Sequence, residues 1–484
     1  MSGLISNLAT SSKALSVHAK GLEIAGKNLA NINNRNYAKQ RVEIGDRGSI
    51  NTQIATESMG VEAMELRQNR DVLLDKSVMR ELTASSGLEV AKKVLESAEI
   101  ALGQFLDRTK DSTSIQNANG ASGGGISDAL TDFFNAWESF SVKPNDVGEK
   151  QLLIAKAQIL AEKINATDKN LNQVQTDADK QLTADVGVVN GILAEIAKTN
   201  EYIAKAELVK PYSAVDLRDQ RQAKLEELSK YIDVQFTATA PDGLGQIDVT
   251  SNGVSLISGK TVLGEYEYNT TTDELSFDAT DNLNDKFFTN ADLPEGKIGA
   301  QILASTVDVK TARDSISTLA TNLIKEVNDL YEIAAPAQGQ NPATKFFLTP
   351  TAPDARLIQF NETVVNAGTL KAGASVGDNK QALDIAALAT KSISALGANV
   401  TFNSYFNKTV TTIAQELNTT NIRLEDQKLS EEMARSSRDE FSGVSQDEEL
   451  TDLMKFQRSF QATSRFINVV DNLLDQVVNR LGSF

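Results

Sequence analysis

The sequence contains no cysteine, and only 8 of its 484 residues are proline. Without cysteine the chain can form no disulfide scaffold, thiolate zinc site or cysteine nucleophile. Scarce proline together with abundant alanine, leucine, lysine and glutamate favours helix. Nowhere do apolar residues run on for the length of a membrane span, so no membrane insertion is expected. No basic segment followed by an apolar run opens the chain, so we expect no cleaved signal peptide.

Basic charge is also in deficit. Lysine and arginine number 48 against 65 acidic residues, which gives a formal net charge of −17. A nucleic-acid partner would require a basic stripe, and we therefore expect none. Acidity of this size favours solubility and makes free subunits repel one another. The length of the chain predicts two to four domains.

Residues for chemistry are missing as well. The chain has no GxSxG, Walker A, GxGxxG or HExxH motif. Its one histidine, His18, is interpreted as an interface residue that allows a weak pH effect on assembly. The acidic cluster at 278–285, counted from Asp281, has Leu283 at the third position and no glycine at the sixth, so it lacks EF-hand spacing. We therefore predict no catalytic, cofactor or metal site, and a protein that is not an enzyme.

What the sequence does contain is a matching apolar stripe at each end, with spacings that alternate between three and four residues. Such a repeat puts the side chains on one narrow seam of a helix, and that seam must be buried against a partner helix. We predict that the two terminal helices pair with each other. The predicted interface residues on this seam are Leu8, Leu15, Leu22 and Leu29 at one end, and Leu453, Phe456, Phe460, Ile467, Val470, Leu474, Val477 and Leu481 at the other.

The ends of the terminal helices carry recognisable signals. The first should stop in NLANINNRNY, where five asparagines favour turns over continued helix. Asn28, Asn31 and Tyr37 of this segment are added to the predicted interface. An extended, partly β segment follows as far as residue 64. Before the last helix, Gly443 should break the chain in the hinge FSGVSQDEE, with Ser445 as the N-cap of the helix that follows.

The sequence pattern predicts that the middle of the chain forms helices on both sides of a β-rich segment. Alternating β-branched residues at 234–277, broken by Asp-Gly and Asn-Gly, predict hairpins. The four prolines at 336–380 indicate an outward, loop-rich excursion. Trp137 should lie in a core. Helices are expected at 71–105 with an interruption near Ser85–Gly87, and at 126–144, 148–206, 215–231, 300–333, 381–396 and 406–438.

The predicted fold class is mainly α with an inserted β domain. It combines a terminal-helix coiled coil, an α-helical middle domain and a small outward β-rich domain. The predicted boundaries are 1–70 with 440–484 for the coiled coil, 71–235 with 298–335 and 381–439 for the middle domain, 236–297 for the β-rich domain, and 336–380 for the loop-rich insertion.

Two segments resemble the axial proteins of the bacterial flagellum. NLANINNRNYAKQ, at 28–40, is similar to the asparagine-rich motif that closes their N-terminal helix, although Asn36 stands where that motif usually has glycine. FSGVSQDEELTDLMKFQRSFQATSRFINVVDNLLDQVV, at 441–478, is similar to their C-terminal signature. ALTDFFNAWESFSVKPNDVGEKQLLIAKAQILAEKIN and the helical stretch at 189–235 resemble the hook-associated junction family within that superfamily.

This resemblance implies a structural protein of the flagellum. It would form a helical ring of about one layer at the junction between hook and filament. Its partners would be copies of itself, the hook protein, a second junction protein toward the filament, and an export chaperone. It would be extracellular, and the type III export route would need no cleaved signal peptide.

The sequence alone leaves three other hypotheses open. Another axial protein, of the hook or rod, would share both ends of the chain but not the internal helical segments. A cytosolic coiled-coil scaffold would keep its termini paired within one molecule. An enzyme, a lyase or hydrolase housed in the β insert, would need a pocket with converging polar groups there.

Overall fold

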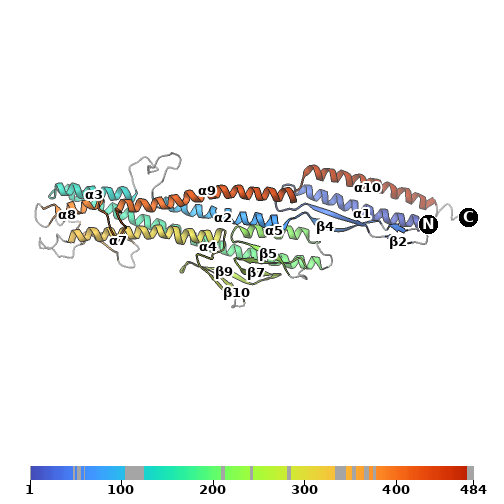
Figure 1. Cartoon of the computed structure of the whole chain (residues 1–484), viewed down its shortest axis with the longest axis horizontal. Helices are drawn as coiled ribbons and strands as arrows, with labels where there is room; N and C mark the ends of the chain where they lie inside the picture. The colour runs from blue at the N-terminus through green and yellow to red at the C-terminus, as the bar shows by residue number, and fades with distance from the viewer. Residues whose placement is uncertain are drawn as a thin grey trace.

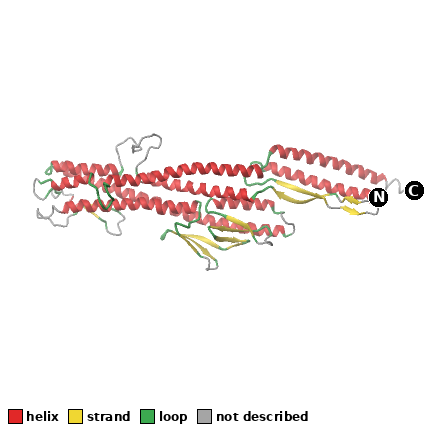
Figure 2. Cartoon of the chain, viewed as in Figure 1, coloured by secondary structure: helices red, strands yellow, loops and turns green. Residues whose placement is uncertain are grey.

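The computed structural model describes residues 2–46, 49–51, 56–58, 60–103, 125–208, 213–239, 244–280, 285–332, 345–350, 356–364, 370–373 and 378–476. These residues form an elongated molecule in which both chain ends lie at the same tip (Figure 1). Helix dominates, and the strands form small antiparallel sheets (Figure 2). No helix in this part of the chain has the length and apolar character needed to cross a membrane.

The tip is built from the two ends of the chain. Helix α1 (Ser2–Ala30) runs antiparallel beside α10 (Gln446–Asp475), which confirms the predicted pairing of the termini. Between α1 and the middle of the molecule the chain forms a long hairpin that also packs on α1. Its strands are β1 (Gln40–Asp46) paired with β4 (Val61–Gln68), and β2 (Ser49–Asn51) paired with β3 (Thr56–Ser58). We call α1, this hairpin and α10 the terminal unit.

The middle of the molecule is a helical bundle. Its helices are α2 (Val72–Ala101), α3 (Ile126–Val142), α4 (Val147–Glu207), α7 (Lys310–Glu332), α8 (Lys380–Ala386) and α9 (Phe402–Ser442). Trp137 is fully buried at its centre, as predicted, with the ring centroid of Phe346 5.2 Å away. Phe346 belongs to the segment 336–380. The described residues of that segment form β12 (Phe347–Leu348), β13 (Gln359–Phe360) and the 3-10 turn η3 (Glu362–Val364). Because the phenylalanines of these strands are buried, this part of the segment is core and not an outward excursion.

The expected interruption of the second helix is wrong. Helix α2 is continuous through Ser85–Gly87. The glycine serves close packing there, because a Cβ at Gly87 would lie 3.0 Å from the carbonyl oxygen of Gly296. Ser85 meanwhile donates a 2.6 Å hydrogen bond to Glu431 of α9. Small residues inside this helix therefore mark contact with its neighbours, which local helix propensity does not register.

Three further helix boundaries differ from expectation. Helix α8 ends at Ala386 in the 3-10 turn η4 (Ala387–Ala389), well before residue 396, and the Ile393 N–H then donates to Val400 O in a loop. The expected helix at 300–333 is α6 (Lys297–Leu303) joined to α7 through a π-helical turn, η1 (Ala304–Val309). Helix α9 begins earlier than predicted because Thr401 and Ser404 form a capping box.

The β-rich insert lies on the side of the bundle (Figure 1). Helix α5 (Val215–Ser229) precedes it, and the predicted Asn-Gly turn is confirmed, since Asn252 and Gly253 have φ values of 45° and 76°. Asn190 of α4 bonds both the N–H and the carbonyl of Tyr266, which ties the insert to the bundle. Its strands are β5 (Gln235–Ala238), β6 (Ile247–Ser251), β7 (Val254–Ser258), β8 (Thr261–Val262), β9 (Gly264–Asn269), β10 (Glu274–Ala279) and β11 (Lys286–Phe288).

Candidate assembly interface

The register of the terminal helices is set by two contacts. Asn28 of α1 bonds Glu449 of α10, and a Cβ at Gly21 would lie 2.7 Å from the ring of Phe456. The steps from Asn28 to Gly21 and from Glu449 to Phe456 are equal and run in opposite directions along the sequence. The pairing is therefore antiparallel with a seven-residue repeat, as a coiled-coil seam requires.

The predicted leucines of α1 lie on the flank of this seam. Each one follows a residue of the heptad that includes Gly21 and Asn28, and one residue turns an α-helix by about 100°. Gly21 and Asn28 are buried, whereas all four leucines are only half-buried. We call Leu8, Leu15, Leu22 and Leu29 the leucine row. In the single chain it is incompletely covered, and the sequence pattern had placed it at the centre of the seam.

The predicted residues of α10 are distributed differently. Val470 is 3% exposed. Leu453, Phe456, Phe460, Ile467 and Leu474 are half-buried, and Val477 and Leu481 lie outside the described residues. Phe456 also faces His18, at 6.4 Å between ring centroids, and burial lowers the pKa of that imidazole. Burial therefore favours the neutral form of His18, so the predicted pH effect is displaced toward acid.

Asn28 holds the end of α1 in place. Its side chain is 1% exposed and uses its full hydrogen-bonding capacity. Nδ2 donates to Gln40 O at 2.9 Å and to Glu449 Oε2 at 3.0 Å. Oδ1 accepts from the Tyr37 hydroxyl at 2.7 Å and from the Gln40 N–H at 3.1 Å. One amide thus joins α1, the turn after it, the first strand and α10.

The other motif residues support this turn. Asn31 Nδ2 donates to the Lys27 carbonyl at 2.9 Å and so satisfies the end of α1. The pKa of Tyr37 is raised by burial and by nearby carboxylates, chiefly Asp219. Asn36, which stands where the resembling motif usually has glycine, does not adopt a positive φ. Its N–H instead donates to Asn34 Oδ1 at 3.2 Å.

Lys39 connects the same turn to the start of α10. Its side chain is only 5% exposed, and Nζ lies 2.6 Å from Glu448 and 3.0 Å from Glu449. Burial opposes the charge on Lys39, but its hydrogen bonds to Glu448 and Glu449 outweigh that effect and raise its pKa. The acidic first turn of α10 therefore complements the helix dipole and also anchors a buried ion pair.

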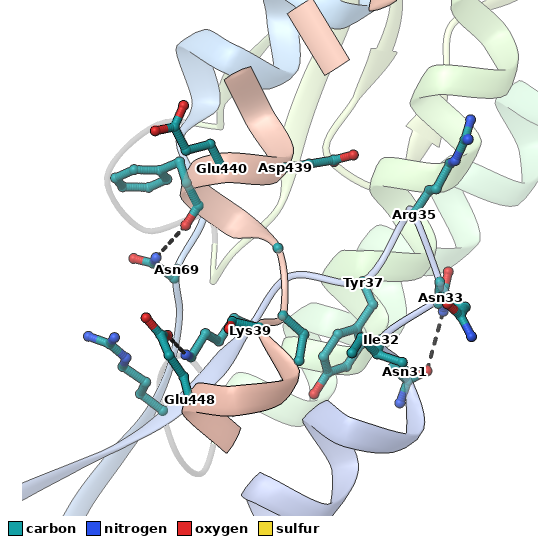
Figure 3. A pocket seen from close by; sticks show the side chains of 16 residues that line it. Asn31, Ile32, Asn33, Arg35, Tyr37, Lys39, Asn69, Asp439, Glu440 and Glu448 are labelled. Atoms are coloured by element: carbon teal, nitrogen blue, oxygen red, sulfur yellow. Dashed lines mark hydrogen bonds and ion pairs between the residues drawn. The ribbon is translucent and has the colours of Figure 1, made fainter. Parts of the chain in front are cut away.

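The chain steps sideways between α9 and α10, which both run toward the tip (Figure 1), and we call the connecting residues 441–446 (Figure 3) the elbow. The Lys39 N–H donates to Ser442 O at 2.9 Å, and Asn69 Nδ2 donates to Phe441 O at 2.6 Å. A Cβ at Gly443 would collide with the carbonyl oxygen of Asp439. The turn after α1 and the two chain segments that connect the terminal unit to the bundle are therefore bonded together, and the predicted hinge is braced by hydrogen bonds. A polar hollow of about 840 Å³ opens beside it.

Ion pairs extend this bracing into the bundle. Arg70 donates to Asp219 at 2.8 Å and to Asp75 at 3.1 Å. Arg438 of α9 donates to Glu226 of α5 at 2.6 Å and to the Arg35 carbonyl at 3.1 Å. Burial raises the pKa of Asp219 to about 6 although Arg70 opposes the shift. The terminal unit is thus connected to α2, α5 and α9 through largely buried charges.

The residues that could hold a metal do not gather. No group of three or more histidine, aspartate or glutamate residues with suitable geometry occurs in the described ranges. Part of the acidic cluster at 278–285 lies outside these ranges. Asp285, which is described, accepts a hydrogen bond from the Ala279 N–H at 2.9 Å and so has a structural role in β10.

The comparisons with known proteins agree with this architecture. Residues 112–347 match the model of the flagellar hook-associated protein FlgK helical domain. Residues 435–481 match that of the flagellar basal body rod FlgEFG protein C-terminal region. The flagellar hook-associated protein 1 of Bacillus subtilis is 23% identical to this chain over an alignment 521 residues long. The alignment covers 100% of this chain and 99% of the relative. The chain is therefore similar to the flagellar hook-associated proteins of the FlgK family, over almost half of its length by the FlgK domain model and over its full length by the Bacillus subtilis relative.

Two further flagellar proteins match over shorter lengths. The flagellar hook-associated protein 1 of Salmonella typhimurium is 23% identical over 72% of this chain and 59% of its own length. The solved structure of the flagellar hook junction protein FlgK from Burkholderia pseudomallei aligns with a TM-score of 0.47 and 19% identity, over 57% of this chain and 47% of that one.

Several interface residues of this chain escaped the sequence reasoning, whereas Asn28 was predicted. Gly21 carries no apolar signal, although it occupies the seam one heptad before Asn28. Lys39, Arg70 and Arg438 act through partners that are distant in sequence. The one available signal was the run of acids at Asp447–Glu449, because three carboxylates in succession at a helix start invite a basic partner as well as the helix dipole.

Proposed function

We propose that this chain is a non-enzymatic structural subunit of the flagellum, placed between hook and filament and assembled helically through its terminal unit. The observation that carries the proposal is the leucine row. Four large apolar side chains stand at heptad spacing on a helix that already has an intramolecular partner, and they remain half-buried. A row of this kind is completed by a neighbouring subunit.

Burial of this row supplies the driving force for assembly. A fully buried leucine contributes roughly 1.5 to 3 kcal/mol relative to an exposed one, and half of that gain is still available per leucine. Free subunits, at a formal net charge of −17, repel one another. Contacts between unlike surfaces propagate as a helix instead of closing as a dimer. A ring of about one layer would follow if other proteins cover its two ends.

The proposed partners are copies of this chain, the hook protein on one side, a second junction protein toward the filament, and an export chaperone. The similarity to flagellar hook-associated and rod proteins supports association with flagellar components in general. The proposed location is extracellular, after export without a cleaved signal peptide. In this location the braced elbow would transmit load between the terminal unit and the bundle.

The test places a charge on each terminal helix and, as a control, on α4 of the bundle. Leu22→Asp and, on α10, Ile467→Asp should leave the helical bundle folded and prevent incorporation into flagella. Val188→Asp, at a position 41% exposed on α4, serves as the control and should be neutral. Immuno-electron microscopy of isolated flagella should place the wild-type protein at the junction. Normal filaments and motility in the Leu22→Asp strain would reject the proposal.

A further inference from the structure

The outward face of α9 carries an apolar row with no partner in the single chain. Ile422, Leu429 and Met433 are 55%, 61% and 65% exposed. At about 100° per residue they lie roughly opposite Leu424, which is buried against the bundle. Asp426 stands between the first two and is also exposed. We call these three apolar residues the α9 row.

A similar row lies on the first part of α4. Leu152 and Ile159 are 45% and 43% exposed, and Lys156 stands between them. The spacing of apolar, charged and apolar residues is the same as that of Ile422, Asp426 and Leu429, and the charge is opposite. Lys156 already lies 2.6 Å from Asp132, but both side chains are partly exposed, so this pair contributes little and can exchange. We call Leu152 and Ile159 the α4 row.

The two rows point away from each other. In the described part of the bundle α9 packs on α2, α3 and α7, and α4 packs on the same three helices. The two helices therefore occupy opposite corners, with α9 along one edge of the molecule in Figure 1. Both begin beside α3, through Lys156–Asp132 and Asn403–Thr131, and both run toward the terminal unit. A second copy in the same orientation can therefore present its α4 row to the α9 row of the first, parallel to it.

The two rows are not level with each other. Lys156 lies near the start of α9 because its partner Asp132 follows Thr131, which bonds Asn403. Asp426 is 23 residues beyond Asn403, and 23 residues of helix span about 34 Å. Pairing the rows displaces one copy along the other by about this distance. A contact between unlike and staggered surfaces cannot close as a two-fold dimer and continues into a helix.

We propose that the α9 row of one copy docks on the α4 row of a second copy, with Asp426 facing Lys156 and Leu429 packing against Ile159. This inference rests on the proposed function, because it adds a second, bundle-level contact to the assembly made by the terminal unit. The occupant is a copy of this chain because the chain itself supplies the complementary surface, matched in spacing and opposite in charge.

The absence of cysteine permits a clean crosslinking test. Flagella are isolated from cells that carry the double variant Leu429→Cys/Ile159→Cys, oxidised, and run on a non-reducing gel. A ladder of linked chains is expected, because every copy offers one cysteine to each neighbour. Each single variant should give no ladder. The pair Leu429→Cys/Val188→Cys, which uses an equally exposed position outside the α4 row, is the matched control and should give none.

A charge exchange tests the same register. Asp426→Lys and Lys156→Asp should each lower the ladder yield of the double-cysteine protein by about two- to fivefold, the effect of losing an exposed ion pair. The combination of both reversals should restore it. Circular dichroism of the purified variants should be unchanged, since both side chains lie on the surface.

The outcomes separate the two proposals. If the protein is present in normal flagella but the cysteine pair gives no ladder, the bundle contact is overturned and the proposed function stands. An equal ladder from the control pair, or a crosslink from Leu429→Cys alone to a different protein, also overturns the contact. If the wild-type protein is absent from flagella, the proposed function fails and this inference fails with it.

Discussion

At the residue scale, the pairing of α1 with α10 depends on Asn28. An asparagine with both N–H groups and both lone pairs satisfied inside a seam specifies one arrangement of the surrounding chain, because few other geometries satisfy all four bonds. It connects Tyr37, Gln40 and Glu449, which come from three separate segments. The asparagine-rich motif therefore functions less as a helix stop than as the lock between α1 and α10.

Replacing Asn28 with alanine should lower the free energy of unfolding of the terminal unit by about 2 to 4 kcal/mol, because several buried polar groups lose their partner at once. Hydrogen exchange of α1 and α10 measures the effect. Asn33→Ala, an exposed position in the same turn, is the control and should stay within about 0.5 kcal/mol of the wild type. Equal protection in the two variants would contradict the role given to Asn28.

Because Asp219 is largely buried beside Arg70, the free energy of unfolding should depend on pH. Its pKa is about 6 in the folded chain because of burial, against an ordinary value of 3.8. The folded state then binds a proton that the unfolded state still lacks, so this carboxyl stabilises the fold below pH 4 and loses that contribution as pH rises through 6.

Asp219→Asn should therefore be more stable relative to the wild type at pH 7.5 than at pH 4, by at most about 3 kcal/mol. The measurement is the difference in unfolding free energy between the two proteins across this pH range. A difference that does not change with pH would show that Asp219 titrates normally.

At the element scale, two glycines of α1 distinguish the seam from the rest of the helix. A Cβ at Gly21 would lie 2.7 Å from the ring of Phe456, whereas a Cβ at Gly26 would meet no atom within 4 Å. Gly21→Ala should separate the terminal helices and lower their stability by about 1 to 3 kcal/mol, the usual cost of overpacking. Gly26→Ala should raise it by about 0.5 to 1 kcal/mol, because alanine is the better helix former.

Hydrogen exchange of residues 6–30 reads out both glycine variants. The two substitutions are chemically identical and lie five residues apart on one helix. A difference between their effects on stability therefore comes from the contact with α10, which only Gly21 makes. Stabilisation by Gly21→Ala would mean that Phe456 does not pack there.

The elements themselves could largely be predicted from the sequence. Long periodic helices such as α4 and α10 were identified, and the Asn252–Gly253 turn carried its own signature. The π-turn at Ala304–Val309 could not be predicted, because it leaves the apolar period almost unchanged. The buried strands β12 and β13 were predicted to be part of an outward loop, because the prolines of this segment indicate a loop. The two strands pair over only two residues each, and the adjacent Phe346 packs against aromatic rings of α3 and α7, which the local sequence does not reveal.

At the scale of the whole molecule, the sequence predicted which helices meet but not which faces remain open. The leucine row is a regular heptad, yet the true seam runs through Gly21 and Asn28, where close approach and hydrogen bonding decide the contact. The ion pairs of Lys39, Arg70 and Arg438 join residues that lie between about 150 and 410 positions apart, and no local pattern reveals them. The consequence is a molecule whose terminal unit and bundle are joined by buried ion pairs and keep apolar rows on their surfaces, as the proposed assembly requires.

The antiparallel register of α1 and α10 in the assembled protein is the most direct test of this account. The seven-residue repeat that starts from the contact between Gly21 and Phe456 predicts that Ala14 faces Thr463, so a disulfide should form within one chain in Ala14→Cys/Thr463→Cys protein recovered from intact flagella. Ala14→Cys/Val470→Cys, displaced by about 10 Å along the helix, should form none. A disulfide in the displaced pair, or one that links only separate chains, would contradict the pairing on which the account rests.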